Sequence, residues 1–239
     1  AIGEILLVVV GILIAVSIGE WRQNIKQDKE LTAYYQGLSD DLSQDKLRLE
    51  SLISLFDNAA DGIVNEVDKM QLNSYNEDSL YSNVPSWMVY VIEFTPHKPT
   101  FTEILSSGKL QLFNNRELKF RILNVYSNLY PELQIREHAT SEFIRNNRTD
   151  ILMDTFRWLK ILDNDKKSIT DLKLDNPKFH INHDWLYDKQ SEKYLKFENY
   201  LNVTRAGYLD NLKRYKNIKI ELESLILLIE NELEKRITE

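Results

Sequence analysis

Two places in the sequence hold side chains whose type and spacing could do chemistry. Glu4 is the one ionisable residue in the apolar stretch 1–19. A carboxyl group inside such a stretch is costly and by default suggests a functional role. His180 and His183, followed directly by Asp184, have a spacing that could bind a metal ion. The first pattern suggests helix pairing or ion passage, and the second suggests a metal site.

The motifs that normally accompany catalysis are missing from the sequence. No H-E-x-x-H arrangement or nearby third ligand supports the histidine pair, so we expect His180 and His183 to be surface or capping residues. Ser107-Gly108-Lys109 lacks the preceding glycine of a phosphate-binding loop, and there is no cysteine nucleophile. We therefore expect no enzymatic activity and no cofactor. A hydrolase with an unrecognised site stays open as an alternative.

The apolar stretch 1–19 is long enough to cross a bilayer. As a helix it covers roughly 28 Å, close to the roughly 30 Å of a bilayer's hydrocarbon core. Trp21 and Arg22 follow at once, where an interfacial aromatic ring and a cation belong. The sequence predicts a transmembrane helix over residues 1–21, with the lipid bilayer as a partner. Because the chain starts without Met inside this helix, we expect that an N-terminal piece is missing.

Small residues in this helix predict a helix-packing face. Gly11, Ala15 and Gly19 recur every four residues, and Glu4 lies within about 20° of the same stripe. Small residues at this spacing let helices approach closely, so we expect a homo-oligomer or an envelope protein as partner. Glu4 would then either hold helices together by hydrogen bonding or, in a ring of copies, conduct protons or cations.

The composition predicts long helices. The 239 residues include only 7 Gly and 5 Pro, whereas Leu, Glu, Lys and Asn are abundant. The net charge of −7 argues against nucleic acid as a partner. The absence of cysteine excludes disulfides and cysteine-ligated metals. Residues 22–239 are therefore expected to form a soluble helical domain.

A first long helix is predicted over about residues 22–71. Its apolar residues fall at heptad a and d positions, which indicates either a stripe in the domain core or a coiled-coil seam between chains. The stripe comprises Tyr35, Leu38, Leu42, Leu49, Leu52, Phe56, Ala59 and Ile63. Asp45 is the one polar interruption, and we expect it at a solvated or fraying site, with a register role as the alternative.

Shorter helices are predicted after a polar linker at 72–84 and a short buried segment at 86–94. Thr100 and Glu103 form a capping-box pattern that predicts Thr100 as the N-cap of a short helix ending at Gly108. Asn114 to Glu117 predicts the start of the next helix in the same way. Pro131 is expected to kink or restart that helix, whose inner stripe then continues through Phe143, Ile151, Phe156 and Leu159.

A second long helix is predicted over about residues 191–237, with Trp185 anchoring the irregular loop before it. Apolar residues repeat at spacings of three and four, and the opposite face is charged. The repeating set is Tyr194, Phe197, Leu201, Thr204, Tyr208, Leu212, Tyr215, Ile218, Leu222, Leu225, Ile229 and Leu233. Its length matches the first helix, so we expect antiparallel packing that returns the C-terminus towards the membrane. The predicted fold class is all-α: a transmembrane helix followed by an elongated antiparallel bundle.

Two stretches resemble a known family. AIGEILLVVVGILIAVSIGEW and PTFTEILSSGKLQLFNNRELKFRILNVYS look like the DUF6090-type family of uncharacterised single-pass membrane proteins of Bacteroidota. Residues 17–20 depart from it, because the family usually shows a Gln/Asn-rich segment there. The resemblance implies the bacterial inner membrane, a basic cytoplasmic N-terminus and a periplasmic C-terminal domain, and it implies no known activity.

These observations together favour a non-enzymatic, membrane-anchored helical scaffold or sensor that oligomerises or binds an envelope partner. The conducting oligomer and the hydrolase remain as alternatives.

Overall fold

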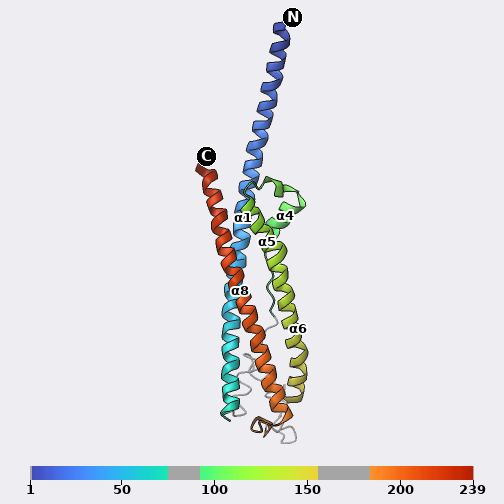
Figure 1. Cartoon of the computed structure of the whole chain (residues 1–239), viewed down its shortest axis with the longest axis vertical. Helices are drawn as coiled ribbons and strands as arrows, with labels where there is room; N and C mark the ends of the chain where they lie inside the picture. Colours follow the sequence, from blue (N-terminus) through green and yellow to red (C-terminus); the bar gives the residue numbers. More distant parts are fainter. Residues whose placement is uncertain (1, 75–91, 156–183, 239) are drawn as a thin grey trace, which may run out of the picture. The chain divides into compact units, whose positions relative to one another are not determined.

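The computed structural model describes residues 2–74, 92–155 and 184–238 (Figure 1). Every regular element in these ranges is helical, which confirms the predicted all-α class. The long helices are α1 (Ile2–Gln71), α6 (Tyr130–Thr155) and α8 (Glu192–Thr238). The shorter elements are α4 (Pro99–Ser106), the 3-10 turn η1 (Lys109–Leu112), α5 (Arg116–Asn124), the π-helical turn η2 (Val125–Leu129) and the 3-10 turn η5 (Asp184–Leu186).

The chain packs into two compact units. Unit 1 contains residues 1–47, 96–129 and 220–239, and unit 2 contains residues 48–95 and 130–219. Both α1 and α8 contribute to each unit. The predicted division separates a membrane-embedded anchor at 1–21 from a water-exposed domain at 22–239. The two packed units do not test this division, which stays a prediction.

Unit 1 forms because α1 has an apolar face that is buried from Leu31 onward. Tyr35, Leu38 and Leu42 are buried there, as the heptad pattern predicted. The ring of Tyr35 packs edge-on against Phe113, with the ring centroids 5.1 Å apart. At the other end of the chain, Arg236 of α8 pairs with Asp28 of α1. The end of α8 therefore lies beside the part of α1 that follows the apolar stretch, as expected for antiparallel packing.

The start of α4 differs from the prediction. Thr100 is already inside the helix, which begins at Pro99, and no side chain of the flanking residues caps it. The cap comes instead from α1, where Asp41 Oδ2 accepts the Thr100 backbone N–H at 3.0 Å. Glu103 likewise turns away from the helix start towards Tyr34, which lies 3.4 Å away. The capping-box prediction was wrong because a distant carboxylate occupies the position that the local motif would fill.

The next two helix boundaries follow local chemistry more closely. Gly108 has a φ of +68°, the left-handed conformation that favours glycine just after a helix, as predicted. Asn115, one residue later than predicted, caps α5 by accepting the Leu118 N–H at 3.0 Å. Pro131 is the second residue of α6, directly after the π-helical turn η2, so the helical run changes its geometry next to the proline.

Unit 2 is built on antiparallel contacts between α1 and α8. Lys219 pairs with Glu50 at 3.0 Å, and Lys189 donates to the Gln71 carbonyl at 2.8 Å. Between these contacts the ring of Phe56 lies 5.0 Å from that of Tyr208. The predicted α8 stripe is buried from Tyr194 through Ile229, of which Leu222, Leu225 and Ile229 belong to unit 1. Its last predicted member, Leu233, is only half-buried. The apolar positions of both long helices therefore form the core of their own chain.

Two smaller predictions of unit 2 have different outcomes. Trp185 is buried and meets Phe197 edge-on, so it anchors η5 on α8 as predicted. Phe143, predicted to face inward, is 41% exposed. Of the segment predicted to be buried at 86–94, the structure describes only residues 92–94, and Phe94 is fully buried. Most of the linker at 72–84, together with Phe156 and Leu159, lies outside the described residues.

Candidate functional site

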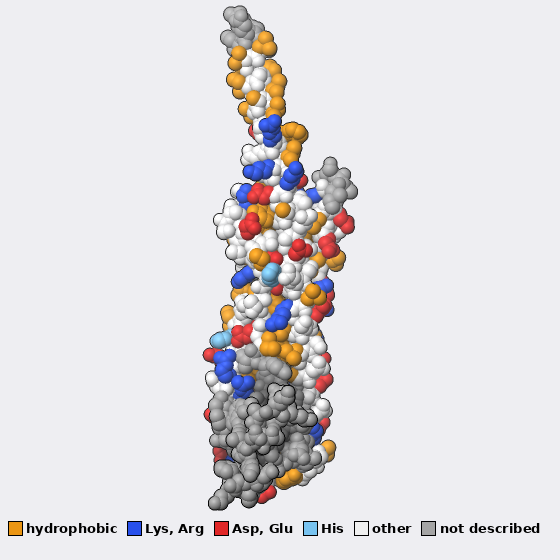
Figure 2. Space-filling model, turned by 180° about the vertical axis from the view of Figure 1, so that it is seen from behind, with side chains coloured by type: hydrophobic (Ala, Val, Ile, Leu, Met, Phe, Trp, Pro, Cys, Tyr) orange, Lys and Arg blue, Asp and Glu red, His pale blue; other side chains and the backbone are white. Residues whose placement is uncertain are grey.

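The first part of α1 is a long apolar surface open to its surroundings. From Leu7 the helix contains a stretch long and apolar enough to cross a membrane. Its large side chains are exposed, with exposed fractions between 42% at Val10 and 74% at Leu7 (Figure 2). Water disfavours such a surface, and a bilayer would cover it. Glu4 lies in this helix, but its side chain is outside the description, so its predicted role stays a prediction.

The small-residue stripe on this helix is open. A methyl group added at Gly11 or Gly19 would meet nothing within 4 Å. Ala15 and Arg22 are exposed as well. The stripe is thus open to a neighbouring helix, and its role in helix packing stays a prediction.

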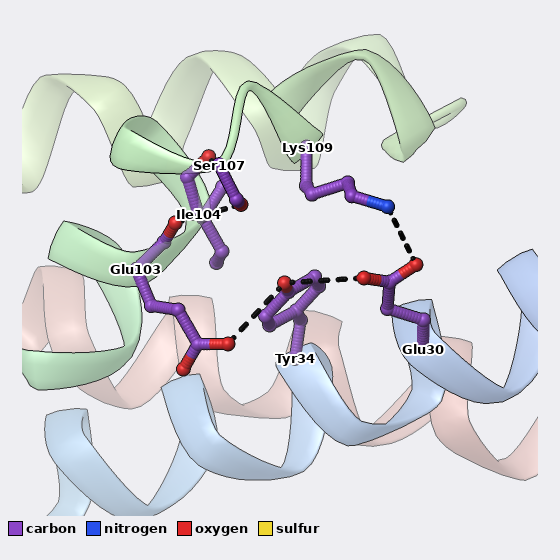
Figure 3. A network of polar contacts seen from close by, with 6 residues as sticks. All are labelled: Glu30, Tyr34, Glu103, Ile104, Ser107 and Lys109. Carbon is purple, nitrogen blue, oxygen red and sulfur yellow. Dashed lines mark hydrogen bonds and ion pairs between the residues drawn. The ribbon is translucent and has the colours of Figure 1, made fainter.

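Beyond the apolar stretch, a polar network joins α1 to the turn after α4 (Figure 3). Glu30 of α1 accepts a hydrogen bond from Lys109 at 2.8 Å. The Tyr34 hydroxyl lies 3.5 Å from Glu30 and 3.4 Å from Glu103, so it can donate its single proton to either carboxylate. The hydrogen bond from Lys109 lowers the pKa of Glu30 and raises the pKa of the lysine. Lys109, the lysine of the Ser107-Gly108-Lys109 sequence, is therefore engaged in an ion pair.

A polar pocket of about 360 Å³ lies in the same unit, beside the end of α8. Arg236 lines it, pairs with Asp28 and has its guanidinium carbon 5.3 Å from the centroid of the Tyr35 ring. The other lining residues are Asn24, Gln27, Leu31, Gln111, Leu112 and Asn114. The amide groups can donate and accept hydrogen bonds. They supply no nucleophile and no acid–base pair for catalysis.

Two buried carboxylates of α1 hold the chain that leads into α4. Asp45 is 1% exposed, and its Oδ1 accepts the His97 backbone N–H at 2.7 Å. Asp41, one turn earlier, caps α4 and has its Oδ1 3.6 Å from the His97 ring. The expectation that Asp45 is solvated was wrong, because the buried carboxylate serves as the acceptor for a backbone N–H of a distant segment. Among the described residues, no group of three or more His, Asp or Glu is placed to hold a metal ion.

A third buried carboxylate, Glu137 of α6, performs the same task in unit 2. It is 1% exposed, and both of its oxygens accept the Phe94 backbone N–H, at 3.1 and 3.0 Å. The Tyr215 hydroxyl donates a further hydrogen bond from α8. Burial raises the pKa of Glu137 to about 7, although both hydrogen bonds act to lower it. A carboxyl group in this state changes its charge near neutral pH while it holds three segments together.

Sequence reasoning missed the role of Glu137, although a signal was present. Glu137 follows Leu133 by four residues and precedes Ile144 by seven, so it lies on the buried stripe of α6. A lone acid on a buried stripe indicates a specific partner. The other predicted candidates, His180 and His183, lie outside the described residues.

These features define a class of protein. It is an all-α protein whose first helix has an exposed stretch that is long and apolar enough to span a membrane. The rest of that helix packs into units in which buried carboxylates bind backbone N–H groups. The chain belongs to DUF6090, a family of unknown function, whose family model matches residues 4–176. The match confirms the resemblance drawn from the sequence and ends before α8 begins. No curated protein and no solved structure matches the chain.

Proposed function

We propose that the protein is a non-enzymatic, membrane-anchored helical scaffold or sensor. One observation carries the proposal: α1 runs without interruption from an exposed apolar stretch into the buried cores. A helix built in this way couples an anchor directly to the packed units. The buried carboxylates support the non-enzymatic part, because Asp41, Asp45 and Glu137 each bind backbone N–H groups of the same chain.

Membrane anchoring is tested by placing charge in the apolar stretch. Ile14→Arg introduces a cation at the middle of the stretch, which costs about 3 kcal/mol at the centre of a membrane helix. Ile220→Arg is the matched control, because Ile220 is similarly exposed and apolar but belongs to α8. We expect the wild-type chain and the control to float with membranes after an alkaline wash and the Ile14→Arg variant to be depleted. A wild-type chain that is released by the wash would refute the anchor.

Assembly is tested by the mass of the protein in nanodiscs. We expect a homo-oligomer, measured beside the Glu4→Gln variant and a chain that starts at Gln23. Loss of assembly without residues 1–22 would show that the membrane helix drives it, and the Glu4→Gln variant would show whether the carboxyl group is needed. A monomeric wild-type chain would exclude self-assembly and also the alternative of a conducting ring, and would direct the search to a different partner chain.

The side of the membrane is tested with a single introduced thiol. The chain has no cysteine, so Asn202→Cys, at an exposed position of α8, gives one reactive group. We propose a periplasmic domain, which predicts labelling of intact cells by a membrane-impermeant maleimide. Labelling only after lysis would place the domain in the cytoplasm.

A further inference from the structure

In the charged segment that follows the apolar stretch, the fold pairs two of the acidic residues with cations from elsewhere in the chain. Between residues 20 and 30, acidic and basic residues alternate along the sequence and give no clear net sign. In the structure, Asp28 is paired with Arg236 and Glu30 with Lys109. Both acids are therefore neutralised by cations from distant parts of the chain.

The basic residues of the same stretch have no such partner among the residues that the structure describes. Arg22, Lys26 and Lys29 are exposed, and none of them forms a hydrogen bond or ion pair with a residue in the ranges that the structure describes. Lys26 acts on Glu30 only at longer range, as a weaker influence on the pKa of that carboxyl than Lys109. At about 100° per residue, spacings of four and three place the three cations on one face of α1. Glu20 precedes Arg22 by two residues and so lies on the other side of the helix. We call Arg22, Lys26 and Lys29 the basic face.

The basic face begins where the apolar stretch ends. Figure 2 shows Lys and Arg side chains gathered at that point. Arg22 directly follows Trp21, and Lys29 is about 10 Å further along the helix. This distance is comparable to the roughly 8–10 Å over which charges act through physiological salt. If Trp21 marks the edge of the bilayer, all three cations lie within reach of lipid headgroups.

We propose that the basic face binds the headgroups of anionic phospholipids and so selects the lipids around the anchor. The inference rests on the proposed membrane anchoring. Three cations at headgroup depth that lack ion-pair partners among the described residues favour phosphate groups without a neutralising amine. A Lys or Arg near an anionic surface gains about fivefold in binding. The whole chain has a net charge of −7, so the positive charge of the basic face is a local feature and does not follow from the overall charge.

The test measures lipid selectivity of the full chain in reconstituted bilayers. Spin-labelled phosphatidylglycerol and phosphatidylcholine report which lipid is immobilised at the protein. The variant Arg22→Gln/Lys26→Gln/Lys29→Gln removes the basic face, and Lys98→Gln/Lys213→Gln/Lys216→Gln removes the same type of charge from exposed sites elsewhere. Glutamine is a good helix former, so α1 is expected to persist.

We expect wild-type protein and the control variant to prefer phosphatidylglycerol at least about fivefold, with the preference lost in the first variant and weakened by about 0.5 M salt. Equal preference in all three proteins would overturn the proposal. Loss of a co-purifying acidic protein with unchanged lipid selectivity would also overturn it and assign the face to a protein partner instead. Failure of the wild-type chain to enter bilayers at all would refute the anchor, and this outcome is distinct from insertion without selectivity.

Discussion

The buried Glu137 makes a quantitative prediction about stability and pH. In the folded chain the pKa of Glu137 is raised to about 7, from an ordinary value of 4.5. Below pH 4.5 the carboxyl group is protonated in both states, so the folded state bears no cost. Between pH 4.5 and 7 the unfolded chain releases the proton first, and the folded chain is penalised. The free energy of unfolding should therefore fall by about 3 kcal/mol across this window and stay constant above it, as far as Glu137 contributes.

The Glu137→Gln variant isolates this contribution. The introduced amide keeps a side-chain oxygen for the Phe94 N–H and cannot ionise, so the pH dependence assigned to Glu137 should disappear. Urea unfolding of the full chain in nonionic detergent, followed by circular dichroism at several pH values, gives the free energy of unfolding for each protein. The difference between wild type and variant should change by about 3 kcal/mol from about pH 4.5 to about pH 8. All other titrating groups are common to both proteins and cancel.

Two further variants sharpen the result. Glu132→Gln removes a carboxyl group of the same helix whose side chain is 60% exposed and whose ion-pair partner, Arg214, is an always-charged guanidinium, so its curve should run parallel to that of wild type. Tyr215→Phe removes a hydrogen bond that lowers the pKa of Glu137, so the window should extend to higher pH. The reasoning is refuted if the wild-type and Glu137→Gln curves run parallel throughout the range.

The remaining predictions concern packing and buried hydrogen bonds, and each is measured by the same unfolding experiment. A methyl group at Gly207 would lie 2.8 Å from Thr140 Cγ2, so Gly207→Ala should destabilise the protein by about 1–3 kcal/mol. Adding Thr140→Ser to this variant should restore most of the lost stability, and an unchanged loss would contradict the contact. Asp45→Ala should cost about 1–3 kcal/mol and Asp45→Asn less, because only alanine removes the side-chain oxygen that accepts the His97 backbone N–H. Equal losses would argue against this explanation. Phe56→Ala should cost about 3–5 kcal/mol, whereas Phe143→Ala at a partly exposed site should cost much less; similar costs would show that Phe56 is not a core residue.

Much of the fold could be predicted because it depends on local periodicity. The stripe of α8 was identified from spacing alone, and burial confirms it from Tyr194 to Ile229. The same holds for α1, where the residues from Tyr35 to Ile63 pack inward. Residues three and four apart share a helix face whatever the tertiary structure is, so the pattern is sufficient.

The polar contacts could not be predicted in the same way, because their partners are distant in the sequence. Thr100 looked like an N-cap, but Asp41 of another helix performs that role. Asp45 looked like a defect in a heptad, although a backbone amide 52 residues away requires its carboxylate. Local motifs describe which bonds are possible, and tertiary packing decides which bonds form.

The acids beside the apolar stretch illustrate the same limit for charge. Sequence alone counts Asp28 and Glu30 against the neighbouring cations. The structure pairs them with Arg236 and Lys109, which are 208 and 79 residues away in the sequence. Only the fold reveals that the basic side chains are left without ion-pair partners in the part of the chain that the structure describes.

The continuity of α1 also fixes the phase between its small residues and its cations. Gly11, Ala15 and Gly19 continue at the same spacing of about one turn into Arg22, Lys26 and Lys29, so both sets lie on one helix face. Two copies that met along the small residues would therefore bring two sets of like charges together. Self-association and the charge of the surrounding bilayer would then be thermodynamically linked: anionic headgroups that neutralise the cations would favour pairing, and pairing would in turn raise the local affinity for such headgroups by the same factor.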